Sequence, residues 1–213
     1  MNFLHYILNF KLQWSLIFCT IVALLGFAVG PTLDAQVKEL QRREARVQAT
    51  YLTHLINFTM WSEEHLPREG KPPTILVLGN ESNGFIASLR YLATQSGLKI
   101  GGQSPKFIHL KRSEAKLAQS ILRKGCQFVF VMSNSSYKPK QINSLSKGAV
   151  VMGQGRIFVT KLKGDVSFIV AKNRVKIVVS ESYFRRTSPK LSSKLANLKS
   201  VVEIFSEADK LKE

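Results

Sequence analysis

Short hydrophobic runs alternate along the chain with polar segments that contain glycine, proline or asparagine. Residues 74–78 and 127–132 are almost continuously apolar, a pattern typical of strands buried on both faces of a sheet. Residues 106–110 and 149–152 are predicted as further strands, and residues 157–159 as a short additional one. We therefore expect a sheet whose central strands have no solvated face.

Apolar residues recur at helical spacing ahead of the first strand. Val47, Tyr51, Leu55 and Phe58 follow one another at intervals of four, four and three residues. Such intervals place side chains on one face, because an α-helix has about 3.6 residues per turn. The pattern predicts a helix over residues 44–58 with these four side chains facing the core.

Helices are also predicted between the strands. Residues 85–96 have helical apolar spacing and end before Gly97, a residue that commonly terminates helices. Ser113 is expected to cap a helix that continues to about Leu122, and residues 139–145 are predicted as a short helix. The alternation of strands and helices indicates βαβ units and a mostly parallel sheet.

The pattern changes near the C-terminus. Residues 166–170 and 175–179 are β-rich and flank a turn in which Asn173 tolerates a left-handed backbone, so a β-hairpin is expected. Two helices are predicted to close the domain, over residues 181–186 and 192–205. With no repeat or linker along the chain, a single domain is expected.

An uncharged segment near the N-terminus predicts the compartment. Between Lys11 and Asp34 lie 22 residues without a charged side chain, and residues 14–29 are apolar apart from a serine and a threonine. A short basic stretch before such a run and small residues ending at Ala35 are typical of a secretory signal peptide. We expect a leader over residues 1–35.

Removal of this leader would leave a periplasmic domain over residues 36–213, with a core at about residues 45–202. The apolar run is shorter than the span of about 20 residues that crosses a membrane, yet long for a signal core. An uncleaved leader would anchor the domain in the inner membrane, facing the periplasm. Basic residues between positions 38 and 46 oppose this orientation, since positive charge tends to stay cytoplasmic.

The chain is strongly basic, with 31 Lys and Arg against 14 Asp and Glu and a formal net charge of +17. Such a charge attracts nucleic acid, anionic lipid or an acidic protein surface, and does not choose among them. Because the basic residues are dispersed among apolar ones and an exported protein seldom meets nucleic acid, we expect no nucleic-acid partner.

One loop has the spacing of a phosphate-binding motif. Gly79 and Gly84 enclose four residues after the first predicted strand, but Phe85 replaces the lysine that a Walker site requires. A Walker site is therefore excluded. Four residues are candidates for a simpler anion-binding loop at a helix N-terminus, although an ordinary tight connection is the more common role: Gly79, Asn80, Ser82 and Gly84.

No residue pattern in the chain predicts a catalytic centre, a metal site or a bound cofactor. The four histidines are scattered, without a second ligand at a metal-binding spacing on the same helix face. Cys19 lies in the predicted leader, which leaves Cys126 alone at the start of an apolar strand, where a buried, unreactive thiol is expected.

Dispersed apolar, aromatic and basic positions follow an order and spacing that resembles the YfiR family. These are Tyr51-Leu52, Phe58, Trp61, residues 75–79, Cys126, residues 128–131, 168–170, 174–177, 185–186 and 190–195. The chain departs from the residues usual in that family at His54, Ser180 and Thr187-Ser188-Pro189, and Cys126 has no disulfide partner. The resemblance implies a YfiR-like α/β fold, a three-layer αβα sandwich around a mostly parallel sheet with a C-terminal β-hairpin.

The resemblance also implies a function without catalysis. It suggests a periplasmic repressor that binds the sensor domain of an inner-membrane diguanylate cyclase and lowers cyclic-di-GMP synthesis. Aromatic and arginine side chains often dominate interfaces, which makes one short segment a candidate for partner binding: Tyr183, Phe184, Arg185 and Arg186. A homodimer is compatible with this function. The alternatives are a periplasmic small-ligand or anion-binding protein and a basic envelope-associated protein that contacts the membrane.

Overall fold

The computed structural model describes residues 33–67, 70–81, 83–172 and 174–207. The chain divides into two compact units, Met1–Leu40 and Gln41–Glu213, and the sheet lies in the second. The predicted leader falls almost wholly outside the described residues and stays a prediction. Within the described part of the chain, no helix combines the length and the apolar character needed to span a membrane.

Among the described residues, seven strands form one sheet in the order β3-β2-β4-β5-β6-β7-β9, and two more, β1 and β8, form a small antiparallel pair. The strands are β1 (Thr59–Met60), β2 (Thr74–Leu78), β3 (Lys106–Leu110), β4 (Phe128–Val131), β5 (Val150–Gln154), β6 (Val166–Ala171), β7 (Arg174–Ser180), β8 (Lys190–Leu191) and β9 (Val202–Phe205). Neighbours in the large sheet are parallel except β6 and β7, which form the expected hairpin.

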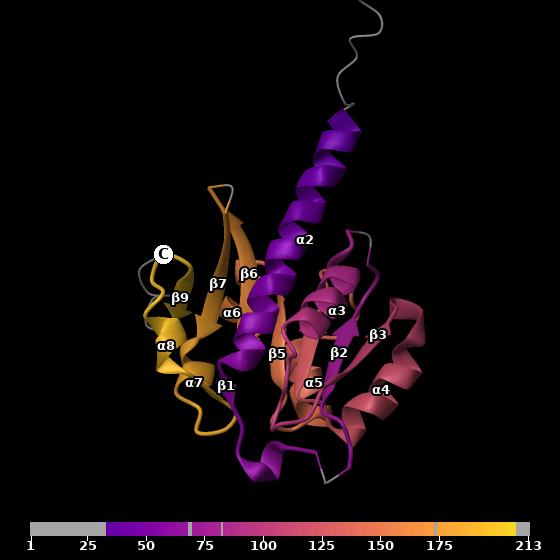
Figure 1. Cartoon of the computed structure of the whole chain (residues 1–213), viewed down its shortest axis with the longest axis vertical. Coiled ribbons are helices and arrows are strands. Elements are labelled where there is room, and N and C mark those ends of the chain that lie inside the picture. The colour runs from indigo at the N-terminus through magenta and orange to yellow at the C-terminus, as the bar shows by residue number, and fades with distance from the viewer. Residues whose placement is uncertain (1–32, 68–69, 82, 173, 208–213) are drawn as a thin grey trace, which may run out of the picture. The chain divides into compact units, whose positions relative to one another are not determined.

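Helices cover both faces of the sheet. The helices are α2 (Leu33–Asn57), α3 (Phe85–Gln95), α4 (Ala115–Lys124), α5 (Pro139–Leu145), α6 (Arg156–Thr160), α7 (Glu181–Phe184) and α8 (Ser193–Ala196). Figure 1 shows α3 and the domain part of α2 crossing in front of the sheet. Their buried side chains join one core cluster, whereas those of α4 and α5 join another. The predicted three-layer αβα sandwich is confirmed.

The two core clusters follow from the alternation of side chains along each strand. Ile75 and Val77 of β2 contribute to the cluster under α2 and α3, and the intervening Leu76 and Leu78 to the cluster under α4 and α5. All four side chains are at most 2% exposed. The apolar run over residues 74–78 was therefore correctly interpreted as a strand buried on both faces.

Helix α2 buries only part of the predicted face: Leu55 is 1% exposed, and Tyr51 and Phe58 are partly buried against the core. Its buried side chains include Ala45, Ala49 and Leu52, whereas Val47 is 38% exposed and Tyr51 only half-buried. Ala45 and Ala49 are both 0% exposed and belong to the same core cluster as Leu55, so the buried stripe of α2 runs along these alanines. The expectation that Val47 faces the core is wrong.

Residues 157–159 are helical, not a strand. They lie in α6, which begins after Gly155 turns the chain out of β5 with a φ of +81°. The ring of Phe158 sits so close to Gly153 and Gly164 that an added Cβ would lie 2.4 Å and 2.2 Å from its atoms. These two glycines provide the space that lets the segment turn inward and bury Phe158.

The predicted helix over residues 192–205 is also wrong. Its first residues form the single turn α8, and its last four form strand β9, which pairs in parallel with β7. Val202 and Ile204 are β-branched and lie opposite Ile177 and Val179 of β7. The unpaired edge of β7 thus decides the conformation of this segment, whose own sequence suits either structure.

Smaller differences occur at helix ends. The helix over residues 139–145 is confirmed, and the one predicted over 181–186 is shortened to α7. Ser113 is not the expected cap, because it lies inside a 3-10 turn, η2 (Arg112–Glu114), that precedes α4. The side chain of Glu114 accepts a hydrogen bond from Lys111 N at 2.8 Å and starts the turn instead.

Candidate functional site

Tyr183 and Phe184 of the predicted partner-binding segment lie in helix α7, and Arg185 and Arg186 follow directly after it. Ser180 caps the helix, since its Oγ accepts a hydrogen bond from Tyr183 N at 3.2 Å. The Tyr183 side chain is completely buried. Its hydroxyl lies 3.1 Å from Thr59 Oγ1, which in turn donates to Leu55 O at the end of α2. Tyr183 therefore fastens α7 to the core.

Arg186 is held by a buried carboxylate. Its Nη2 donates to Asp165 Oδ1 at 2.6 Å, and Val151 N donates to the other carboxylate oxygen at 2.8 Å. The Arg186 guanidinium also lies over the Tyr183 ring, 5.2 Å from its centre, which is a cation–π contact. Asp165, only 3% exposed, thus joins β5, the start of β6 and the end of α7.

This arrangement shifts the titration of two buried groups. Burial raises the pKa of the Asp165 carboxyl, and the Arg186 guanidinium and the Val151 N–H lower it in part. Burial likewise raises the pKa of the Tyr183 hydroxyl, which stays protonated and able to donate. The ion pair with Arg186 is the feature that makes a charged Asp165 tolerable at this depth.

The four partner-binding candidates therefore occupy different environments. Tyr183 is buried, and Arg186 reaches solvent with only 28% of its side chain. Phe184 is partly buried and packs against the main core cluster. Arg185 has 76% of its side chain exposed and forms an ion pair with Glu181 at 2.5 Å. Of the four side chains, Arg185 is the most accessible to a partner.

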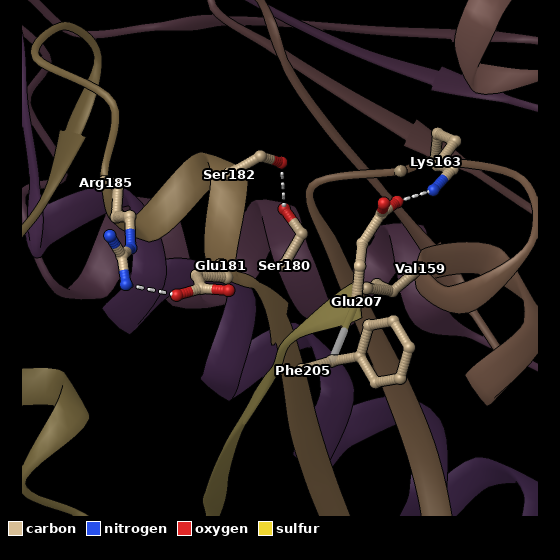
Figure 2. A pocket seen from close by; sticks show the side chains of 9 residues that line it. Val159, Lys163, Ser180, Glu181, Ser182, Arg185, Phe205 and Glu207 are labelled. Carbon is tan, nitrogen blue, oxygen red and sulfur yellow. Dashed lines mark hydrogen bonds and ion pairs between the residues drawn. The ribbon is translucent and has the colours of Figure 1, made fainter. Parts of the chain in front are cut away.

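A pocket of about 370 Å³ opens beside Arg185. Figure 2 shows how side chains from three separate parts of the sequence surround it. Val159 and Phe205 provide an apolar wall, and the hydroxyls of Ser180 and Ser182 lie 3.2 Å apart on another side. The pocket combines an apolar surface with hydroxyl groups, which suits an inserted side chain better than a single ion.

The charged groups around this pocket are paired with one another. Glu181 binds Arg185, and Lys163 binds Glu207, so two cations and two carboxylates balance. The pairs are substantially exposed, with 76% of Arg185 and 72% of Glu207 accessible. Exposed ion pairs contribute little stability, about 0–1 kcal/mol, so a partner could exchange them at small cost.

The predicted anion loop uses several of its amide groups within the protein. Gly79 N donates to Leu110 O at 3.0 Å, and Asn80 N donates to the Asn134 side chain at 2.9 Å. The Asn134 amide also donates back to Asn80 O at 2.8 Å, which clamps the ends of β2 and β4 together. Gly84 forms the left-handed N-cap of α3, and Ser82 lies outside the described residues. Anion binding here stays a prediction.

The structure also shows the surroundings of the cysteine and of a histidine that were considered as reactive or metal-binding residues. Burial raises the pKa of the Cys126 thiol to about 12, as suits its place in the core at 4% exposure. His65 Nδ1 lies 3.0 Å from Ser62 Oγ, which also contacts Ser188 Oγ at 2.7 Å. Among the described residues, no three His, Cys, Asp or Glu side chains form a group that could hold a metal ion.

Two polar residues that organise α7 were not singled out from the sequence. Asp165 and Thr59 are both buried, and each binds a residue more than twenty positions away in the chain. Asp165 carried a weak signal, because an acidic residue directly before an apolar strand is unusual unless it is paired. Thr59 carried none, because its partner Tyr183 is 124 positions distant.

Comparison with known proteins identifies the overall family. Residues 45–199 match the family model described as YfiR/HmsC-like, which is well over half of the chain. The match includes the whole of the large sheet except β9, and it contains α7 and its anchors. A search of curated proteins gave no significant match.

Proposed function

The chain belongs to the YfiR/HmsC-like family, and from that premise we propose that it represses an inner-membrane diguanylate cyclase by binding the periplasmic part of that enzyme. The family is periplasmic, regulatory and non-enzymatic, and it acts on a partner signalling protein. The family match over residues 45–199 is the observation that carries the proposal.

Repression by binding has a simple physical basis. A membrane sensor that exchanges between an active and an inactive conformation shifts toward whichever form a bound protein favours. The shift is limited by the difference in affinity for the two forms, and about 1.4 kcal/mol corresponds to a tenfold change in their ratio. No bond has to be made or broken by the repressor.

The partner contact is proposed to lie around α7 and the pocket of Figure 2. Arg185 is the exposed anchor, and Phe184 supplies apolar area beside it. Tyr183 and Arg186 contribute indirectly, because their buried contacts hold α7 in place. The pocket beside Arg185 would accept a side chain of the partner, which is the usual construction of an interface hot spot.

The function is tested by deleting the gene and measuring cellular cyclic-di-GMP by mass spectrometry. We expect the level to rise, and to return to normal when the wild-type gene is restored. Deletion should have no effect in a strain that also lacks the target cyclase. An unchanged level in cells that normally express the protein would contradict the proposal.

The contact surface is tested by Arg185→Glu, which reverses the charge of the exposed anchor. We expect cells carrying this variant to show the cyclic-di-GMP level of the deletion strain, with normal amounts of the protein. Arg123→Glu is the matched control, because Arg123 is also exposed but lies at the end of α4. If both variants repress equally well, α7 is not the contact.

Export is a separate prediction. Alkaline phosphatase is active only after export, so a fusion placed after Glu39 should show activity in intact cells. Cleavage after Ala35 would give a mature chain that begins at Gln36, which N-terminal sequencing of the periplasmic protein can verify. An inactive fusion would place the domain in the cytoplasm and would contradict the proposed partner contact as well.

A further inference from the structure

A second pocket lies where edge strand β3, helix α4 and the loop before β2 meet, at the opposite end of the strand order from β7 and β9. It has a volume of about 720 Å³. Strand β3 is the edge strand at one end of the sheet. Helix α4 covers one face of the sheet through Ala118 and Leu122, which are buried. A second side of α4, with Leu117, Ile121 and Lys124, forms one wall of this pocket, which we call the β3–α4 groove.

The β3–α4 groove has an apolar surface. Leu117 and Ile121 are four residues apart, so they lie on the same face of α4. Leu117 is 49% exposed and Ile121 is half-buried. Half-buried Ile108 of β3 lines the groove with them. Three branched aliphatic side chains thus border a hollow that is open to solvent, where an acyl chain could remove them from water.

The groove is also bordered by cations. Lys71, Lys106 and Lys124 line it and are exposed. None of the three forms an ion pair within the described part of the chain, and no aspartate or glutamate lines the groove there. This contrasts with the pocket beside Arg185, where each cation has a carboxylate partner. The described lining of the groove therefore has a net positive charge.

We infer that the β3–α4 groove binds a single-chain anionic amphiphile, such as a fatty acid or a lysophospholipid. The acyl chain lies against Ile108, Leu117 and Ile121, and the carboxylate or phosphate head lies among the three lysines. The volume is within the range of about 300–1,000 Å³ that small-molecule sites occupy. A lysine ammonium is a mobile point charge, so three of them accept either head group without demanding one geometry.

Other anions fit the groove less well. A free phosphate would use the lysines but leave the aliphatic side chains in water. A flat bilayer surface could meet the lysines but could not fill a hollow between a strand and a helix. An amphiphile uses both parts of the groove at once. The inference stands apart from the proposed repressor function, because it concerns another surface and another kind of ligand.

Binding is tested by isothermal titration calorimetry on the protein as it is purified from the cells that express it. The probe is dodecanoate below its micelle concentration, compared with dodecyltrimethylammonium, inorganic phosphate and phosphatidylglycerol vesicles. We expect saturable binding of dodecanoate, at least about tenfold weaker binding of the cation with the same chain, and no binding of phosphate alone. Equal binding of both amphiphiles, or binding to vesicles only, would overturn the inference.

Variants then locate the site. Leu117→Gln and the double change Lys106→Glu with Lys124→Glu should each weaken dodecanoate binding by about tenfold or more. The matched control is Lys140→Glu with Lys147→Glu, which changes net charge equally on exposed positions outside the groove and should leave the affinity within about twofold. An equal loss in the control would show that only overall charge matters, against the inference.

The heat-unfolding midpoint of each variant is measured in parallel. If the double reversal unfolds at a lower temperature, Lys106→Gln with Lys124→Gln removes the charges without adding repulsion and serves in its place. Full-affinity binding to this neutral variant and to Leu117→Gln would place the ligand elsewhere.

Discussion

Cys126 shows how one buried residue links stability to pH. It lies two residues before β4 with 4% exposure, and Cys126 N donates to Ser146 Oγ at 2.9 Å. Burial disfavours the thiolate, which raises the pKa of the thiol from its ordinary value of 9.0 to about 12 in the folded protein. The unfolded chain therefore loses this proton first as the pH rises.

The sign of the pH effect follows from these two values. Below about pH 9 the thiol is protonated in both the folded and the unfolded state, so it does not change how the free energy of unfolding depends on pH. Between about pH 9 and about pH 12 only the unfolded state is ionised, so the free energy of unfolding falls by about 1.4 kcal/mol per pH unit from this group. Cys126→Ala should remove this contribution to the pH dependence of the free energy of unfolding.

The measurement is denaturant unfolding of both proteins from about pH 8 to about pH 11. The packing loss in Cys126→Ala does not depend on pH, so the two stability curves should converge as the pH rises. Parallel curves over the whole range would show that the thiol is not protected by burial.

Element α7 illustrates how neighbouring residues can have opposite roles. Arg186 neutralises the buried Asp165 carboxylate, whereas Arg185 meets Glu181 at the surface. Removing one member of a buried ion pair leaves an uncompensated charge and costs about 3–5 kcal/mol, while an exposed pair contributes at most about 1 kcal/mol. The two arginines are adjacent in sequence but should differ greatly in their effect on stability.

We expect Arg186→Met to lower the free energy of unfolding by about 3 kcal/mol at neutral pH, and Arg185→Met by less than about 0.5 kcal/mol. Without Arg186 the pKa of Asp165 should rise further, so its carboxyl would be protonated over a wider acidic range. Because the ionised, unpaired Asp165 carboxylate destabilises this variant, the decrease in its free energy of unfolding grows as the pH increases and shrinks in acid. Denaturant unfolding at about pH 5 and about pH 8 would reveal this difference, and a loss independent of pH would contradict it.

The loop that enters β8 offers a second comparison at this scale. Ser188 Oγ accepts a hydrogen bond from Ser62 N at 3.0 Å and another from Ser62 Oγ at 2.7 Å, at a position where the sequence departs from the family pattern. Ser188→Ala should lower the free energy of unfolding by about 1–2 kcal/mol, because Ser62 N loses its partner in a partly buried site. Ser136→Ala, at an exposed position, is the control, and an equal effect of both changes would contradict this role.

The charge of the whole molecule governs how it meets other molecules more than how it folds. With a formal net charge of +17, the protein should be attracted over long range to an acidic partner surface. Salt shortens the reach of this attraction, since the Debye length falls from about 10 Å at 0.1 M to about 3 Å at 1 M ionic strength.

If the proposed partner is the cyclase sensor domain, we expect its association rate with this protein to fall by about tenfold across that salt range, with a smaller change in the dissociation rate. Surface plasmon resonance at several salt concentrations measures both. A rate that does not depend on salt would mean that the basic surface does not steer this encounter.

The order of strands and helices was determined largely by local sequence. Residues 74–78, 106–110 and 139–145 adopt the predicted structures, because their apolar runs and end residues leave few alternatives. The hairpin of β6 and β7 also formed as expected. The described residues among 79–84 form a loop between a strand and a helix, as expected, and anion binding by this loop stays a prediction. The hydrogen bonds between Asn80 and Asn134 depend on two segments 54 positions apart.

What the sequence determined by itself is thus the fold class, through patterns that hold within a few residues. The tertiary structure decided the rest, because the choice depended on partners distant in the chain. Strand β9 exists because the edge of β7 was open to it. Arg185 is mostly exposed and Arg186 is mostly covered, because only Arg186 is paired with the buried Asp165 carboxylate. Burial and pairing are properties of the packed molecule, and identical residue types acquire different roles from them.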